Sequence, residues 1–336
     1  MNKEQFTFPL INWYKEHQRD LPFRKNKDPY SIWVSEIMAQ QTQISTMLPY
    51  YSAWLKKWPS IDALSKANDQ EVKKMWEGLG YYRRASNLLK GAQYIMTHHH
   101  GQFPDDPLEI REIPGIGDYT TGAIASIAFN KRVPAIDGNV IRVMSRLNED
   151  ERDFLKVKHK RDLTSTLTDL MHDVNPSDFN QGLMELGALI CTPKNPQCEA
   201  CPLNSICLAT KHNTTHLYPI KHRKTKSITI ELNTYYYQKD DQLLVSKDSS
   251  DGLMKGLLRL PQVNRQEEDS NHIHYEYSLK HVFSHRVWLM DVYSCTHLEI
   301  IHPDWFWIPL SDIEKYSFAT AHKDIINTML TKGSNQ

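Results

Sequence analysis

Four closely spaced cysteines limit the folds that are open to this chain. Five of its 336 residues are cysteines, and four of these fall between positions 191 and 207, separated by six, two and five residues. The first twenty residues carry charged side chains and lack the apolar segment of a secretion signal, so we expect a reducing, cytoplasmic environment. Thiols grouped in such an environment are metal ligands more often than disulfides. The four are Cys191, Cys198, Cys201 and Cys207.

The unequal spacing favours one kind of metal centre. Structural zinc sites usually pair two short C-x2-C knuckles, and here only Cys198 and Cys201 have that spacing. One compact segment with unequal gaps is typical of a cubic 4Fe-4S cluster, in which every iron has a cysteine ligand. We therefore predict a 4Fe-4S cluster with a structural role. A zinc ion and four unrelated buried cysteines stay open as alternatives.

Composition excludes two functional classes. The chain carries 40 Lys and Arg residues against 40 Asp and Glu residues, so its formal net charge is zero. A protein that binds nucleic acid through bulk positive charge is therefore excluded, although a local basic face is not. No apolar run approaches the roughly 18 residues of a membrane helix, so we expect no membrane association. A charged fraction of 24% beside 40% hydrophobic residues predicts folded domains.

The hydrophobic pattern changes near residue 220. Before it, helical signals dominate, among them a capping box at Asn68–Glu71. A basic linker covers residues 221–227, and apolar residues then alternate with polar ones, first over residues 228–232, which predicts strands. We therefore predict an all-α domain over residues 1–220 and a smaller α+β domain over residues 228–336.

A glycine-rich turn joins two of the expected helices. Pro114, Gly115, Ile116 and Gly117 stand between one helix and the next, which Asp118 can cap. Two glycines separated by one residue let backbone N–H groups converge without a side chain in the way. With a helix N-terminus behind them, they predict an anion nest suited to a DNA phosphate. A tight helix–turn–helix without a ligand is the alternative.

Two carboxylates have surroundings suited to acid chemistry. Glu36 stands beside the apolar stripe of an expected helix, within the segment Trp33–Thr42, which reads WVSEIMAQQT. A carboxyl group held against apolar surface has a raised pKa and can donate a proton near neutral pH. Asp137 follows an apolar stretch and precedes Gly138, where it can cap a helix. Each residue alone has an ordinary alternative, as a surface glutamate or a capping aspartate.

Together these motifs resemble those of a known family. The hairpin, Asp137 about twenty residues later and the four cysteines resemble the helix-hairpin-helix DNA glycosylases with an iron–sulfur cluster, over most of residues 5–220. Within that superfamily, the WVSEIMAQQT segment is most similar to the MutY-type adenine DNA glycosylases. Residues 283–285 and 256–261 resemble motifs of that family's C-terminal, Nudix-like domain. The acidic helix needed for triphosphate hydrolysis is absent from this sequence, so we expect that domain to recognise a nucleotide without hydrolysing it.

The resemblance implies a fold and a reaction. The fold is a six-helix lobe with the hairpin over about residues 28–130, an iron–sulfur lobe of residues 1–27 and 131–220, and a Nudix-like lesion-recognition domain. The reaction is base-excision repair by hydrolysis of the N-glycosidic bond of adenine mispaired with 8-oxoguanine or guanine. The implied partner is duplex DNA with such a mispair, bound by a monomer in the bacterial cytoplasm.

The resemblance also assigns roles to single residues. Glu36 would protonate the flipped adenine and then help to activate water, and Asp137 would stabilise the positive sugar. Tyr119 and Asn139 would line the site. The residues implied to contact the adenine or the DNA are Arg24, Gln41, Thr42, Tyr81, Gln181, the hairpin residues Pro114, Gly115, Ile116 and Gly117, and, at the 8-oxoguanine, Phe283, Ser284 and His285.

Two other functions compete with this one. A glycosylase-lyase of the same superfamily carries a lysine where Tyr119 stands, and a phenol cannot form the Schiff base that such an enzyme needs. A non-catalytic lesion-binding protein would lack one of the two carboxylates. Departures from the family pattern at Phe23, Ala39, Asp118 and Arg259 touch no catalytic role directly. We therefore expect an essentially monofunctional hydrolase.

Overall fold

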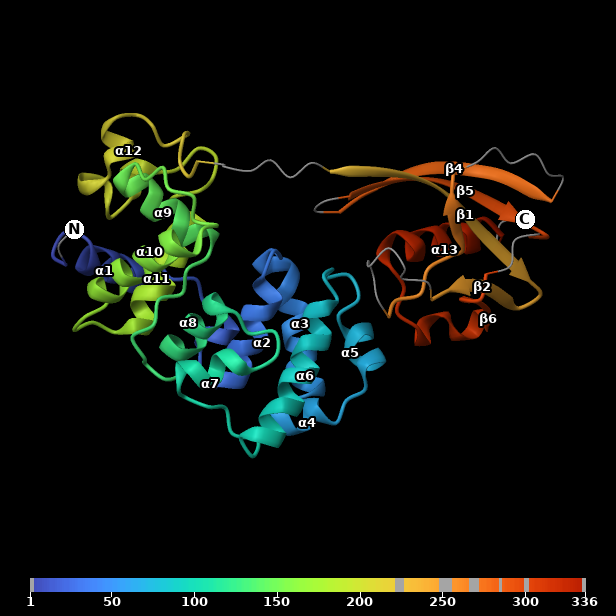
Figure 1. The fold of residues 1–336 in the computed structure, drawn as a ribbon, viewed down its shortest axis with the longest axis horizontal. Helices are drawn as coiled ribbons and strands as arrows, with labels where there is room; N and C mark the ends of the chain where they lie inside the picture. Colours follow the sequence, from blue (N-terminus) through green and yellow to red (C-terminus); the bar gives the residue numbers. More distant parts are fainter. Residues whose placement is uncertain are drawn as a thin grey trace. The chain divides into compact units, whose positions relative to one another are not determined.

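The computed structural model describes residues 3–220, 227–247, 256–265, 272–283, 286–298 and 302–333. Its contacts divide the chain into two compact units, residues 1–66 with 87–223 and residues 67–86 with 224–336 (Figure 1). Most of the predicted basic linker, together with Ser284 and His285, lies outside the described residues. In the described part of the chain, no helix has the length and apolar character to cross a membrane.

The first unit is built from helices, several of which begin at signals in the sequence. Proline at the start of α2, α7 and α11 supplies a preset backbone angle, and Asp28, Asp106 and Asn175 cap these three helices. The helical elements of this unit are α1 (Thr7–His17), η1 (Pro22–Arg24), α2 (Pro29–Ala39), α3 (Ile44–Lys57), α4 (Ile61–Ser65), α6 (Arg83–His98, shared with the second unit at its start), α7 (Pro107–Glu112), α8 (Asp118–Ile127), α9 (Gly138–Asn148), α10 (Val157–Leu170), α11 (Pro176–Leu189), η2 (Cys198–Ala200), η3 (Asn204–Ile206) and α12 (Leu208–Lys211).

One hydrophobic cluster joins the start of the chain to the second half of this unit. Leu10 and Tyr14 of α1 pack in it with Phe179 and Leu183 of α11, and side chains of α9 and α10 complete it. Three of the four clustered cysteines lie partly buried against the same cluster. Residues of α1 therefore share a core with residues between 136 and 207.

The second unit is the predicted α+β fold. Its sheet has the order β4-β5-β1-β2-β6, with β3 also paired to β1. Only β1 and β5 pair in parallel among the described strands, and the other pairs are antiparallel. The elements are β1 (Ile228–Lys239), β2 (Gln242–Ser246), β3 (Gln262–Asn264), β4 (Ile273–Val282), β5 (Arg286–Cys295), β6 (Trp305–Pro309), η4 (Leu310–Lys315) and α13 (Thr320–Gly333).

Residues 67–86 group with this sheet unit, although the chain enters them from helices of the first unit. Their helix α5 (Asp69–Met75) begins with the predicted capping box, in which Asn68 accepts a hydrogen bond from a backbone N–H group of the first turn. Just after α5, Glu77 accepts a hydrogen bond from Nζ of Lys323 in α13 at 2.9 Å. The domain boundaries drawn from the sequence stay a prediction.

Candidate active site

Asp137 lies at the start of α9, where it caps the helix as the sequence predicts. One carboxylate oxygen accepts the backbone N–H of Val140 at 2.8 Å, and the other accepts the side-chain amide of Asn139 at 2.7 Å. Burial raises the pKa of Asp137, while these hydrogen bonds and the charge of Arg142 lower it. The net effect is a pKa above the usual value for aspartate, although every one of these partners favours the ionised form of this fixed, partly buried carboxyl group.

Glu36 lies on α2, between buried neighbours on the same helix. Its carboxylate accepts the phenol O–H of Tyr119 from α8 at 2.5 Å. Burial raises the pKa of Glu36 to about 7; the hydrogen bond from Tyr119 and the charge of Arg24 lower it, whereas the charge of Asp137 raises it further. At neutral pH a large share of Glu36 therefore carries the proton that a general acid must donate.

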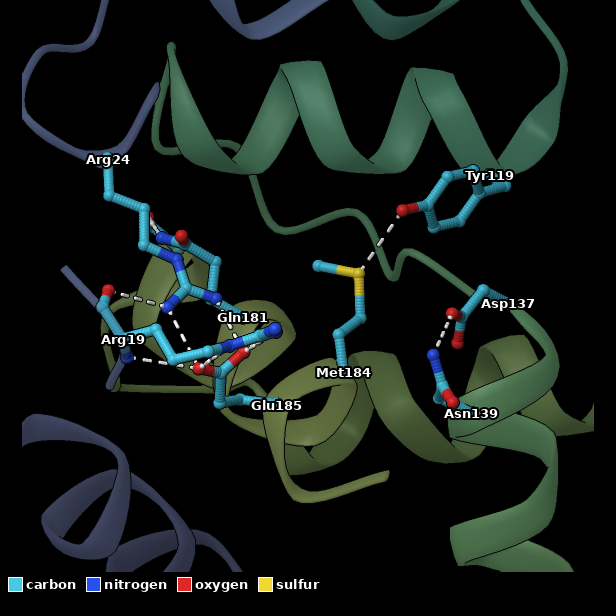
Figure 2. Close-up of polar contacts among 9 residues, drawn as sticks. Arg19, Arg24, Tyr119, Asp137, Asn139, Gln181, Met184 and Glu185 are labelled. Atoms are coloured by element: carbon cyan, nitrogen blue, oxygen red, sulfur yellow. Dashed lines mark hydrogen bonds and ion pairs between the residues drawn. The ribbon is translucent and has the colours of Figure 1, made fainter. Parts of the chain in front are cut away.

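Tyr119 links Glu36 of α2 to a third helix, α11. Its hydroxyl contacts Sδ of Met184 in α11 at 3.3 Å (Figure 2). Burial and the charges of Glu36 and Asp137 hold the pKa of Tyr119 well above 10, so it stays a neutral phenol. Helix α8 can approach the segment before Asp137 because Gly122 has no side chain; a Cβ there would lie 2.2 Å from the carbonyl oxygen of Pro134.

Arg142 connects the active site to the cysteine segment. Its guanidinium donates to the side-chain oxygen of Asn139 at 2.8 Å, to the carbonyl of Gly187 at 2.7 Å and to the carbonyl of Cys191 at 2.7 Å. Helix α11 passes close to Asn139 at Gly187, where a Cβ would lie 2.5 Å from the Cβ of Asn139. The sequence predicts Asn139 for the site but does not predict this role of Arg142.

Arg24 and Gln181, both predicted to hold adenine, are paired within the protein. Both terminal nitrogens of Arg24 donate to Glu185 of α11, at 3.1 and 2.8 Å, and Arg19 donates to the same carboxylate (Figure 2). The side-chain amide of Gln181 donates to Ser177 at 2.9 Å. The sequence does not predict the contacts of Arg19 and Glu185. The available signal was one carboxylate inside the apolar run Leu183–Leu189.

The hairpin has the predicted conformation, with one difference. Gly115 has a φ of 86°, and a Cβ there would meet Asn87 at 2.6 Å, so this position requires glycine. Helix α8 is capped by Gly117 and not by Asp118, which is its first residue. Asp118 accepts instead from Nε of Arg111 at 2.7 Å, so a cation offsets its charge beside the proposed phosphate nest.

The remaining predicted DNA contacts are scattered over both units. Gln41, exposed, and Thr42 follow α2 in the first unit, and Tyr81, 50% exposed, belongs to the second. Gln41 and Tyr81 both have positive φ angles, 55° and 49°. Phe283 stacks edge-on against Trp288, with ring centroids 4.8 Å apart. Ser284 and His285 fall outside the described residues, so their predicted role is untested.

The cysteine segment has the chemistry that an iron–sulfur cluster requires. Burial raises the pKa of the Cys191 and Cys201 thiols, so their thiolates need positive charge nearby. Arg146 of α9 supplies one such charge, because its Nη1 donates to Sγ of Cys191 at 3.3 Å and to the carbonyl of Thr192 at 2.7 Å. Among the described residues, no three His, Cys, Asp or Glu side chains form a group that could hold a metal ion. The four thiols are not closed around one point in this structure, but the charges of Cys191, Cys198 and Cys207 act on Cys201. Four neighbouring thiols of this kind are the donor type of a cluster whose irons replace the thiol protons.

Comparison with known proteins agrees with this geometry. Residues 34–168 match the HhH-GPD superfamily of base excision DNA repair proteins, residues 191–207 match the iron-sulfur binding domain of endonuclease III, and residues 234–328 match the NUDIX domain. A Schizosaccharomyces pombe adenine DNA glycosylase is 30% identical over 93% of this chain and 86% of its own length. One from Buchnera aphidicola is 37% identical over 78% of this chain and 75% of its own. The chain belongs to the adenine DNA glycosylase family.

Other relatives are longer. The Arabidopsis thaliana adenine DNA glycosylase is 38% identical over 79% of this chain, which spans 48% of that protein, and the human one is 40% identical with 39% spanned. Among solved structures, a thermostable thymine-DNA glycosylase has a TM-score of 0.58 at 26% identity, covering 62% of this chain and 97% of that one. An endonuclease III–DNA complex has a TM-score of 0.54 at 21% identity, covering 63% and 98%, and shows the fold alone. The predicted fold class and iron–sulfur cluster are confirmed.

Proposed function

We propose that this chain removes adenine paired with 8-oxoguanine or guanine from duplex DNA. The observation that carries the proposal is the contrast between two carboxyl groups. Burial raises the pKa of Glu36, which accepts a hydrogen bond from Tyr119, to about 7, whereas Asp137 is fixed by hydrogen bonds that favour its ionised form. One group can give up a proton at neutral pH, and the other can face a developing cation. The family names of the relatives support the same reaction.

The reaction uses Glu36 as a neutral acid that later takes back a proton, and Asp137 as an anion. Glu36 transfers its proton to a ring nitrogen of the flipped adenine, and the bond between the sugar and the base then breaks, with its electron pair leaving on adenine. The sugar becomes an oxocarbenium ion, which the carboxylate of Asp137 stabilises. Water adds to the sugar and returns its proton to Glu36, so the acid is regenerated.

Tyr119 supports hydrolysis over lyase chemistry. A lyase needs an amine nucleophile that forms a Schiff base with the sugar. The side chain at position 119 is a phenol whose pKa lies well above 10, and it donates to Glu36. We therefore propose an essentially monofunctional enzyme. We also propose that it acts as a monomer in the cytoplasm.

Binding to DNA is assigned to three elements. The N–H groups of the Gly115–Gly117 turn would hold a phosphate, which positions the protein without reading sequence. Base flipping leaves a gap in the stack, and planar or amide side chains such as Gln41 and Tyr81 suit that gap. Thr42 lies next to Gln41, and Arg24 and Gln181 would contact the adenine.

The second unit is assigned to lesion recognition. Its match to the NUDIX domain supports a nucleotide-binding surface, for which Phe283, Ser284 and His285 are the proposed contacts. Truncation after residue 220 should weaken the preference for 8-oxoguanine over guanine more than it slows removal of adenine itself, although it also removes the partners of Glu77. The double substitution S284A/H285A tests the same assignment without removing the second unit. An unchanged preference in both proteins would contradict the assignment.

The function is tested by turnover. Purified protein is incubated with duplexes that hold adenine opposite 8-oxoguanine, guanine or thymine, and alkali then cleaves the abasic product. We expect strand breaks for the first two and none for thymine. The variant D137N should lower the single-turnover rate at least about a hundredfold, because it removes the anion that faces the sugar cation. No strand break with any duplex would contradict the proposal.

The four cysteines would hold the cluster as a structural part of this enzyme. The cluster would hold the segment of residues 191–207 together through four iron–thiolate bonds, with no iron left open to substrate. Purified protein should be brown and contain about four irons per chain. A colourless protein with one tightly bound zinc would contradict this assignment.

A further inference from the structure

Glu185 lies at the centre of a buried charge cluster that the proposed reaction does not use. Its side chain is 1% exposed, and it accepts five hydrogen bonds from two arginines. Arg19 donates through its backbone N–H at 3.0 Å, through Nε at 2.8 Å and through Nη2 at 2.7 Å. Arg24 donates through Nη1 at 3.1 Å and Nη2 at 2.8 Å. Figure 2 shows both arginines converging on Glu185.

The cluster leaves one donor of Arg24 unused. Nη1 of Arg24 also donates to the carbonyl of Arg19 at 3.1 Å, so both terminal nitrogens are engaged. Nε of Arg24 is buried and has no hydrogen-bond partner among the described residues. A buried N–H group without a partner costs free energy unless a ligand completes it.

The same stretch of α11 faces the catalytic groups. Gln181 stands one turn before Glu185, and Met184, its immediate neighbour, contacts the hydroxyl of Tyr119. Arg24 is one of the three residues whose charge or hydrogen bond acts on Glu36, with Tyr119 and Asp137. The charge of this cluster therefore acts on Glu36 through Arg24, although Glu185 takes no part in the proposed proton transfer.

Stability alone does not account for these three charges. A buried ion pair rarely stabilises a fold more than apolar side chains of the same size, because desolvation offsets the attraction. Here a single anion is shared by two cations, so the cluster keeps an excess positive charge beside the site. A purely structural contact would need neither the second cation nor the open Nε.

We propose that Glu185 is a positioning residue, which holds both terminal nitrogens of Arg24 so that its Nε–H donates to a ring nitrogen of the flipped base. Glu185 also offsets the charge of Arg24, so that Glu36 keeps its proton at neutral pH. This inference rests on the proposed function, since it needs a base in the site. Arg24 would touch the base, and Glu185 would act only through Arg24.

The test compares three variants of the full chain with the wild type. E185Q removes the anion that faces both arginines, and R19Q removes one cation while the pair between Glu185 and Arg24 stays. R19Q/E185Q removes one charge of each sign. Single-turnover excision of adenine opposite 8-oxoguanine is measured from about pH 5 to about pH 9, and thermal unfolding checks that each variant folds.

The expected results separate positioning from folding. E185Q should excise at least about tenfold more slowly, and its rate should begin to fall at a pH lower by about one unit, because an uncompensated cation favours ionised Glu36. R19Q removes a cation, so its rate should begin to fall at a higher pH than that of the wild type, opposite to E185Q. An E185Q profile that coincides with the wild type, or equal losses in E185Q and R19Q without a shift, would overturn the proposal.

The double variant keeps the test usable if E185Q does not fold. R19Q/E185Q preserves the charge balance, so its pH profile should match the wild type while its rate falls, because Arg24 is no longer held. A rate close to that of the wild type would overturn the proposal. If wild-type protein itself leaves all three duplexes intact, the proposed function fails before this inference is tested.

Discussion

Two glutamates near the active site carry the same carboxyl group in opposite surroundings. Glu36 receives a hydrogen bond from a neutral phenol, and burial raises its pKa to about 7. Glu185 is also desolvated, yet its hydrogen bonds and ion pairs with Arg19 and Arg24 lower its pKa to about 2. Burial is common to both regions, so the placement of the arginines decides which carboxyl group holds a proton at neutral pH.

The difference explains how one helical unit can hold both a neutral acid and a carboxylate that stays ionised. Had Arg24 paired with Glu36, the acid would be ionised and could not protonate a base. The ion pair with Glu185 offsets most of the charge of Arg24, which would otherwise lower the pKa of Glu36 further. Pairs of titratable groups whose environments separate their pKa values are typical of acid–base enzymes.

The largest expected effect is on the reaction rate of E36Q. Glutamine keeps the shape of Glu36 but has no proton to give, so single-turnover excision should fall at least about a hundredfold. Binding to duplex with adenine opposite 8-oxoguanine, measured by fluorescence anisotropy, should persist. E16Q, an exposed glutamate on α1, is the matched control and should behave as wild type. Near-wild-type excision by E36Q would show that Glu36 is not the general acid.

Glu36 and Glu185 should have opposite effects on the free energy of unfolding. The pKa of Glu36 is raised from 4.5 to about 7, so the folded state binds more protons in that range, and stability falls as pH rises through it. E36Q should therefore be more stable than wild type above about pH 7, by up to about 3 kcal/mol.

Glu185 has the reverse linkage. Its pKa is lowered from 4.5 to about 2, so its stabilising contribution is present above about pH 4.5 and is lost as pH falls toward 2. E185Q should be less stable than wild type at pH 7 by up to about 3 kcal/mol, because Arg24, which is mostly buried, and Arg19, which is 35% exposed, lose their partner. Urea unfolding at several pH values measures both variants, and a shift of the same sign in both would break the comparison.

The pH dependence of the wild-type rate is the next expected effect. Because Glu36 must be protonated to act, excision should decline as pH rises through about 7, approaching tenfold for each further unit. D137N would retain this decline at a lower overall rate. A rate that is flat from about pH 6 to about pH 9 would show that Glu36 is not the acid.

The smallest expected effect comes from Y119F. This variant removes the O–H group that donates to Glu36, and that hydrogen bond lowers the pKa of Glu36. Excision should fall only about two- to tenfold, and its decline should move to higher pH. Y14F, which alters another buried tyrosine of this unit, serves as the control for packing. A decline that moves to lower pH would contradict the description of this contact.

Local signals in the sequence predicted much of this arrangement. The cap at Asp137, the hairpin glycines and the cysteine spacing each act within a few residues, so they can be recognised without the fold. The contact between Tyr119 and Glu36 joins residues 83 positions apart, and that between Arg19 and Glu185 joins residues 166 apart. Such pairs depend on how helices pack, and the pattern of apolar residues does not encode which polar side chains will meet.

The grouping of residues 67–86 with the sheet unit bears on how the protein can be divided experimentally. The polypeptide passes between the two units three times, so they are interleaved and not strung in series. Removing everything after residue 220 also removes Lys323 and the backbone N–H of Phe318, both of which donate to Glu77. The shortened protein thus loses a lesion-recognition surface and the scaffold beneath the segment that carries Tyr81, and only substitutions in the full chain separate those two losses.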